Sequence, residues 1–292
     1  MRERILDLAQ STSELGVSDN YLIKALLAGH SGTGKTQGSI TLPRTEGKLL
    51  LHLNYDGRKE TLAGEEGIVS IDLYESDPES PKAWDRGEEV RKELWALVHR
   101  EKIDENGVIE NPFPYSGVIE DGLSMMARTA MNSALLTDNQ RGLGGSPARQ
   151  HYNPQIHYLV KHINSMRALP CHYVLCAHFD MISTEDEGGG LKMTPKITRS
   201  LRTEVPAWFN ETYRTYRESV KGKTHYFWST HGDGLYEFFK STLNNKGKYW
   251  NSPVRIDFEN PPVGFERLLQ YRFGQLKQDE ENQPPEKGTV KP

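Results

Sequence analysis

The chain has 292 residues, of which 36% are hydrophobic and 26% charged, and its formal net charge at pH 7 is -4. This length suits one large α/β domain or two small ones, with a core that needs no disulfides. No apolar run approaches the roughly 18 residues of a membrane-spanning helix. The charged, amphipathic N-terminus does not have the pattern of a signal peptide. The spacing of the two cysteines matches no metal-binding or redox motif. We therefore expect a cytoplasmic protein, not bound to a membrane, whose Cys171 and Cys176 are buried free thiols.

The first predicted elements surround a phosphate-binding loop. Residues 4–16 indicate a short helix, and the mostly apolar run 21–28 indicates a buried strand. Residues 29–36 then read GHSGTGKT, which fits the P-loop pattern GxxxxGK[ST]. The segment after Lys35 stops at Pro43 and is consistent with a short helix. A strand, a loop and a helix in this order are the context in which the motif binds nucleotides; the alternative is a glycine-rich turn without function.

The residue types in this loop suit a triphosphate. Backbone N–H groups of the loop and the N-terminus of the next helix bind phosphate oxygens. Lys35 is expected to reach the β- and γ-phosphates of ATP, and the Thr36 hydroxyl to hold Mg²⁺. Gly32 and Gly34 permit backbone angles and a close approach that a Cβ atom would prevent. The nucleotide-binding residues predicted on this basis are Gly29, His30, Ser31, Gly32, Thr33, Gly34, Lys35 and Thr36.

The rest of the chain alternates predicted strands with predicted helices. Apolar, aromatic and threonine-rich runs predict strands at 48–55, 67–74, 115–121, 171–178, 211–216 and 224–230. Helical spacing predicts helices at 84–100, 123–136 and 156–169, and polar segments predict loops at 101–114, 137–153 and 179–196, the last two mobile. This alternation implies a mostly parallel sheet covered on both faces. We divide the chain into an N-terminal helical extension (1–20), an ATPase domain (21–274) and a charged, disordered tail (275–292).

Polar side chains at the strand ends complete a predicted ATP site. A P-loop needs a carboxylate at the tip of a neighbouring strand to orient Mg²⁺, and we assign Asp121 to this role. Asp56 is the candidate for positioning the attacking water. Glu120 competes with it, although Glu120 faces the other side of the sheet if the strand continues that far. His178 ends a strand at a place suited to sensing the γ-phosphate. The alternatives left open are an acidic strand end in solvent and a capped core histidine.

One part of the chain is strongly basic. Residues 191–225 contain eight lysines and arginines against three glutamates, a local excess of five positive charges. This excess indicates either an anion-binding surface or a solvated face.

In this order, the landmarks resemble the phage-encoded RecA-like P-loop proteins, a group of AAA-domain nucleotide-binding proteins that includes single-strand-annealing-type phage recombinases. The matching segments, within a resemblance over about residues 22–255, are AGHSGTGKT at 28–36, LNYDG at 53–57, GVIEDGLS at 117–124, YVLCAH at 173–178 and TPKITRSLRTEVPAWFN at 194–210. The departures are Thr198 or Arg199 where the family has glycine, an acid shifted to Glu211, and Glu120 directly before the magnesium acid.

The resemblance implies an α/β fold of the RecA-like P-loop NTPase class, with a mostly parallel central sheet, helices on both faces and a C-terminal antiparallel strand pair. It also implies a homo-oligomer with ATP between subunits, and DNA-facing loops at 137–153 and 179–196. By this analogy Tyr152 and Phe179 stack on bases. The analogy assigns phosphate-binding charge to Arg141, Arg149, Lys192 and Lys196, and a trans-acting role at the neighbour's γ-phosphate to Lys246 and Lys248.

The sequence therefore predicts a Mg²⁺-dependent ATPase acting on DNA, in phage recombination, annealing or replication in the host cytoplasm. Its predicted partners are single-stranded DNA and phage single-strand-binding or recombination proteins. Three other functions stay open: a phage DNA-packaging-type motor ATPase, a small-molecule kinase and an ATP-gated interaction protein.

Overall fold

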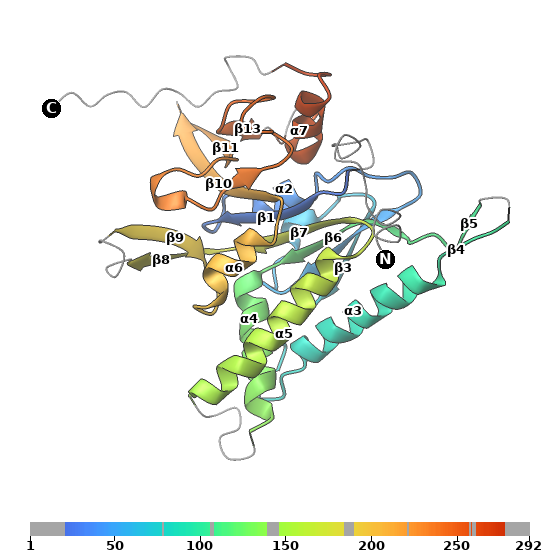
Figure 1. The fold of residues 1–292 in the computed structure, drawn as a ribbon, viewed down its shortest axis with the longest axis vertical. Coiled ribbons are helices and arrows are strands. Elements are labelled where there is room, and N and C mark those ends of the chain that lie inside the picture. Colours follow the sequence, from blue (N-terminus) through green and yellow to red (C-terminus); the bar gives the residue numbers. More distant parts are fainter. Residues whose placement is uncertain are drawn as a thin grey trace, which may run out of the picture.

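The computed structural model describes residues 21–77, 79–105, 108–138, 146–183, 190–220, 222–256, 258 and 261–277. Within these residues a nine-stranded sheet lies between helices on both of its faces (Figure 1). The strand order is β13-β11-β10-β1-β7-β6-β2-β3, and β12 pairs with β10. The predicted helix 4–16, the extension 1–20 and most of the predicted tail 275–292 lie outside the described residues.

Six neighbouring strands of this sheet are parallel. They are β1 (Lys24–Gly29), β2 (Leu49–Asn54), β3 (Ile68–Asp72), β6 (Tyr115–Asp121), β7 (His172–Ala177) and β10 (Glu211–Val220). The sequence predicts all six, and β6 to the residue, five of them from apolar runs and β10 from its tyrosines and threonines. Their carboxyl ends meet at one edge of the sheet, which is where open α/β sheets bind ligands.

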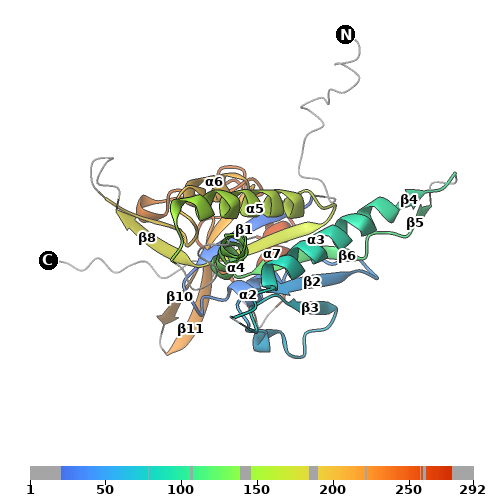
Figure 2. The same cartoon turned by 90° about the horizontal axis from the view of Figure 1, so that it is seen from below.

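Helices on the two faces divide the core in two. One side is covered by α3 (Ala83–Arg100), α4 (Leu123–Leu136), α5 (Arg149–Arg167) and α6 (Leu201–Ala207), and the other by α2 (Lys35–Ser39) and α7 (Gly264–Arg272) (Figures 1 and 2). Along β1, Leu26 and Ala28 pack in the first core, while Ala25 and Leu27 pack in the second. Because side chains alternate along a strand, both sets of positions must be apolar, as they are here.

The last strands of the sheet are antiparallel. β10 pairs with β11 (Lys223–Ser229), β11 pairs with β13 (Val254–Ile256), and β12 (Lys240–Ser241) pairs with the start of β10. The sequence predicts β11 but neither β12 nor β13, because strands this short carry no readable alternation. Helix α7 and the 3-10 helices η1 (Glu60–Leu62) and η3 (Gly234–Tyr236) are also absent from the sequence prediction.

Three segments predicted as loops contain regular structure. Segment 101–114 forms a hairpin of β4 (Lys102–Ile103) and β5 (Ile109–Glu110), and 179–196 forms one of β8 (Phe179–Ser183) and β9 (Leu191–Pro195). The two hairpins project from opposite ends of the molecule (Figure 2). Helix α5 begins inside the predicted loop 137–153, because His151 Nδ1 accepts a hydrogen bond from the Ala148 N–H at 2.8 Å and caps the helix start.

The fold class predicted from the sequence is correct. The molecule is an α/β protein with a mostly parallel sheet, helices on both faces and a C-terminal antiparallel strand pair. No helix in the described part of the chain is both long enough and apolar enough to cross a bilayer.

Candidate functional site

The P-loop occupies the carboxyl edge of the sheet, between β1 and α2. Gly32 and Gly34 have φ angles of 71° and 79°, in the left-handed region that favours glycine. A Cβ atom at Gly29 would lie 2.1 Å from the Thr215 hydroxyl oxygen on β10, so only glycine fits at this position as well. Because these positions carry no side chain, a bound ligand can approach the backbone of the loop closely.

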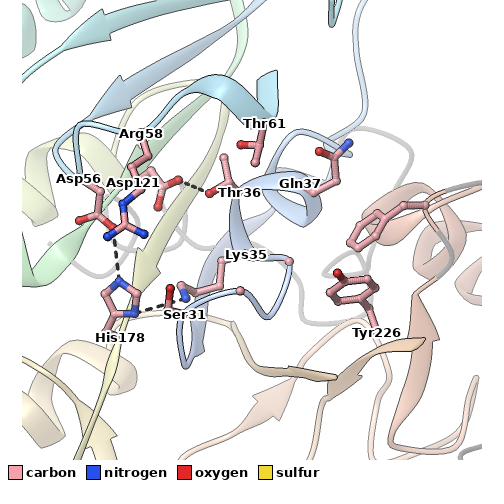
Figure 3. Close-up of a pocket in the computed structure, with 13 residues that line it drawn as sticks. Ser31, Lys35, Thr36, Gln37, Asp56, Arg58, Thr61, Asp121, His178 and Tyr226 are labelled. Carbon is pink, nitrogen blue, oxygen red and sulfur yellow. Dashed lines mark hydrogen bonds and ion pairs between the residues drawn. The ribbon is translucent and has the colours of Figure 1, made fainter. Parts of the chain in front are cut away.

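A cavity of about 410 Å³ opens in front of this loop (Figure 3). The predicted residues that line it are Ser31, Gly32, Gly34, Lys35, Thr36, Asp56, Asp121 and His178. Of the other loop residues, Thr33 is hydrogen-bonded to Thr215 at 2.7 Å between hydroxyl oxygens, and the His30 ring packs 5.6 Å from the ring of Phe179. Thr33 and His30 therefore help to fix the conformation of the loop and do not line the cavity.

Lys35 begins helix α2 and is nearly buried, with 7% of its surface exposed. Its ammonium donates hydrogen bonds to the backbone oxygens of Gly29 at 3.0 Å and His30 at 2.8 Å. Burial lowers the pKa of this ammonium, while the carboxylates of Asp121 and Asp56 act in the opposite direction. The loop thus holds a cation next to the cavity, where a phosphate would need one.

Thr36, the residue after Lys35, is hydrogen-bonded to Asp121 at the end of β6. The Thr36 hydroxyl donates a hydrogen bond to Asp121 Oδ2, and Asp121 is 4% exposed. Although burial acts to raise the pKa of Asp121, the interactions with His52 and Thr36 hold it below its usual value, so the carboxylate is ionised. The sequence places Asp121 on a strand next to β1. In the structure β7 lies between β1 and β6, and the contact to Asp121 is made by α2.

These two oxygens fit a magnesium ion. Mg²⁺ prefers hard oxygen ligands and is usually held by one or two carboxylates together with substrate phosphates. Thr36 supplies a hydroxyl and Asp121 an ionised carboxylate, and Asp56 Oδ1 is a buried oxygen without a hydrogen-bond partner in the described structure. No cluster of three or more metal-binding side chains occurs among the described residues. An ion here would therefore depend on the phosphates of its nucleotide.

Asp56 and His178 form the wall opposite the P-loop. Asp56 follows β2 and His178 follows β7, and His178 Nε2 lies 3.3 Å from Asp56 Oδ2. The other ring nitrogen, Nδ1, lies 3.5 Å from the Lys35 ammonium (Figure 3). A carboxylate and an imidazole from two strand ends and an ammonium from the start of α2 thus lie in one row along the cavity.

Glu120 is not part of this cavity, and the prediction that it is a candidate catalytic acid is wrong. It is fully buried on the opposite face of β6, where Oε1 lies 2.7 Å from His162 Nε2 on α5. Its other oxygen, Oε2, accepts a hydrogen bond from the Tyr173 hydroxyl. Adjacent residues of a strand point to opposite faces, and the regular part of β6 includes Glu120. Glu120 therefore belongs to the helix-covered core.

Five further residues line the cavity without having been predicted: Gln37, Arg58, Thr61, Tyr226 and Phe258. The rings of Tyr226 and Phe258 lie 5.3 Å apart, and a Cβ atom at Gly34 would approach each of them to 3.1 Å. Tyr226 lies in the strand predicted at 224–230, and the aromatic composition of that strand is the sequence feature that could have indicated it. Phe258 and Arg58 carry no such signal, because their place at the cavity depends on how the strands are ordered.

The described residues among the predicted DNA-binding and trans-acting set do not line the cavity. Arg141 falls outside the described residues. Arg149 and Lys196 are exposed, at the start of α5 and just after β9, and Lys192 Nζ on β9 lies 3.2 Å from Glu237 Oε2. Lys246 and Lys248 are exposed after β12, with the Lys248 ammonium 5.3 Å from the centre of the Tyr249 ring. Their predicted roles stay predictions.

The two aromatic residues predicted to stack on bases differ from each other. Tyr152 is 41% exposed on α5, but Phe179 is only 8% exposed. The Phe179 ring packs at 5.6 Å from Tyr236 and 6.0 Å from Phe239. Phe179 is thus a core residue, and the prediction that it stacks on bases is wrong.

Comparisons with known proteins do not assign the chain to a family. No family model matches it, and no curated protein matches it. Among solved structures, it is similar to the flagellar accessory protein FlaH from Methanocaldococcus jannaschii, with 10% sequence identity over 80% of this chain and 84% of that chain, at a TM-score of 0.38. A likeness at this level says nothing about the function of this chain, which depends on the chemistry of the site.

Proposed function

We propose that the protein binds ATP with Mg²⁺ in this cavity and hydrolyses it. The observation that supports this most strongly is the convergence of Lys35, the Thr36–Asp121 pair and the Asp56–His178 pair around one cavity in front of a P-loop. A glycine-rich turn without function gives no reason for a buried lysine and an ionised, buried aspartate to face the same space.

Each group has a part in the reaction. The loop N–H groups and Lys35 bind the β- and γ-phosphates, and Thr36 with Asp121 would hold Mg²⁺. When bound, the ion neutralises charge on the phosphate oxygens. Asp56 orients a water molecule for in-line attack. The water oxygen bonds to the γ-phosphorus as the bond from that phosphorus to the β,γ-bridging oxygen breaks, leaving the electron pair on ADP, and the water proton passes to the Asp56 carboxylate and on to solvent.

The purine base belongs on the side of Tyr226 and Phe258. Their rings stand against Gly34, on the far side of the P-loop from Asp56 and His178 (Figure 3). Aromatic faces bind bases by stacking, which is worth about 1–3 kcal/mol for each base. The triphosphate then runs from this aromatic pair along the loop toward Asp56.

A variant at Asp56 separates binding from hydrolysis. Asp56→Asn keeps the shape of the side chain but removes the acceptor for the water proton, so we expect kcat to fall about 10²- to 10⁴-fold with ATP affinity nearly unchanged. Phosphate release and equilibrium binding of a fluorescent ATP analogue measure the two quantities. If Asp56→Asn hydrolyses ATP at the wild-type rate, Asp56 has no part in the chemical step.

We also propose that hydrolysis serves a DNA transaction of the kind carried out by the phage proteins that the sequence resembles. The support is the excess of five positive charges within residues 191–225 and the exposed, projecting β8–β9 hairpin that carries Lys192. Phosphate backbones bind such surfaces through counterion release.

A further inference from the structure

Arg58 lies on the cavity wall that faces the P-loop lysine. It lines the cavity together with Asp56, Asp121 and His178. Figure 3 draws Arg58 on the side of the cavity that also holds Asp56, Asp121 and His178. This is the end of the cavity at which the proposed function places the γ-phosphate.

The local chain conformation separates Arg58 from its basic neighbour. Gly57 has a φ angle of 73°, and this left-handed turn redirects the chain after β2. Lys59 then extends toward the edge strand β3, where its ammonium lies 2.6 Å from Asp72 Oδ2. The two adjacent basic residues thus have different surroundings: Lys59 forms a surface ion pair with Asp72, and Arg58 lines the cavity.

The charges around the cavity favour a phosphate contact by Arg58. Lys35 approaches the phosphates from the P-loop, where its ammonium contacts the backbone oxygens of Gly29 and His30. A second cation on the facing wall would stabilise the charge that develops on the γ-phosphoryl oxygens during attack. A guanidinium suits this place, because it stays charged and presents a planar fork that binds two phosphate oxygens at once. Arg58 is exposed, so its side chain can turn onto a ligand without disturbing the core.

We propose that Arg58 binds the γ-phosphate of ATP within its own subunit. This inference rests on the proposed ATPase function. Arg58 donates hydrogen bonds to the γ-phosphoryl oxygens and transfers no proton, since a guanidinium does not deprotonate in proteins.

Arg217 is the competing cation within the same subunit. It stands on β10, and its guanidinium carbon lies 3.7 Å from where a Cβ atom at Gly32 would be. Its cross-strand partner is Tyr226, so it belongs to the aromatic side of the P-loop. From there Arg217 can contact the base or the α-phosphate of the nucleotide, whereas Arg58 lies on the side of Asp56 and His178.

Single variants with a matched control test the contact. In Arg58→Ala we expect kcat to fall on the order of 10³-fold, the low end of the range for arginine fingers, with ADP affinity unchanged because ADP lacks the γ-phosphate. Lys59→Ala removes the adjacent charge and should change neither quantity. Unchanged turnover in Arg58→Ala, or the ATP-selective loss appearing in Arg217→Ala instead, overturns the proposal.

Mixing two inactive variants tests whether the arginine acts within its own subunit. Lys35→Ala subunits carry an intact Arg58, and Arg58→Ala subunits carry an intact P-loop. An equimolar mixture should hydrolyse ATP no faster than the two variants alone, whereas recovered activity shows that a neighbour supplies the arginine and contradicts the proposal. If the wild-type protein binds neither ATP nor ADP, the proposed function itself is wrong, which is a different outcome from an active, unaffected Arg58→Ala.

Discussion

Asp121 and Glu120 are adjacent carboxylates with different surroundings. Asp121 faces the cavity and accepts a hydrogen bond from Thr36, while Glu120 faces α5 and contacts His162 and Tyr173. The alternation of side chains along β6 causes the difference. If the register of β6 were shifted by one residue, Glu120 would face the cavity and Asp121 the core. Substitutions at these two positions therefore test which carboxylate belongs to the site.

We expect Asp121→Asn to abolish Mg²⁺-dependent ATP hydrolysis, because the neutral amide no longer attracts the ion. Glu120→Gln should keep most of the activity of the folded protein, while lowering the free energy of unfolding by about 3–5 kcal/mol, as for a broken buried ion pair. Phosphate release at saturating Mg²⁺ and urea unfolding measure the two effects. Loss of turnover in Glu120→Gln together with an active Asp121→Asn would reverse the assignment.

At this scale the sequence predicts the residues that belong to a motif or to the end of an apolar strand. Five residues of the P-loop, together with Asp56, Asp121 and His178, were found in this way and line the cavity. Arg58, Tyr226 and Phe258 were not, because their place depends on the path of the chain after a strand and on the order of β10, β11 and β13 outward from β1. No local pattern encodes that arrangement.

Among the elements, buried strands were predictable and exposed hairpins were not. A strand covered on both faces must be apolar throughout, which is visible in the sequence. The hairpins β4–β5 and β8–β9 project into solvent, and exposed side chains such as Ile103, Met181 and Leu191 follow no burial pattern. The predicted start of α5 was too late, because its N-cap residue is Ala148, which is not a usual N-cap residue, and the capping side chain is that of His151 at the third helical position.

The β8–β9 hairpin and the residue after it carry the prediction about DNA. Changing both Lys192 and Lys196 to Glu should weaken binding of single-stranded DNA and reduce the slope of log affinity against log salt by about 1.4, as expected for two lost phosphate contacts. Fluorescence anisotropy with a labelled oligonucleotide across a salt titration measures both. Lys102→Glu, on the other hairpin, is the control and should have no effect. An affinity that does not change would show that the β8–β9 surface is merely solvated.

At the scale of the whole molecule, one buried charge network joins the sheet to its helical layer. His162 on α5 lies 2.7 Å from Glu120 on β6 and 2.8 Å from Glu88 on α3. Burial acts to lower the pKa of His162, but the two carboxylates outweigh it and raise the pKa to about 9. The folded protein therefore holds a buried imidazolium between two carboxylates.

This network makes stability depend on pH in a definite direction. Because the pKa of His162 rises on folding from 6.5 to about 9, its stabilisation is complete below pH 6.5 and is lost as the pH rises through 9. We expect the free energy of unfolding to fall by about 3 kcal/mol over this range. Urea unfolding at pH 6, 7.5 and 9 measures it, and His162→Gln should show a flatter profile. Equal slopes in the two proteins would mean that His162 is not charged in the fold.

The central claim is that the P-loop binds ATP for hydrolysis. The most direct measurement is the rate of phosphate release from ATP by the wild-type protein and by Lys35→Ala, each with and without Mg²⁺. We predict Mg²⁺-dependent turnover in the wild type and background rates in Lys35→Ala, whose circular dichroism spectrum stays that of the wild type. Wild-type turnover from Lys35→Ala would contradict the account, and so would a wild-type protein that releases no phosphate from ATP in the presence of Mg²⁺.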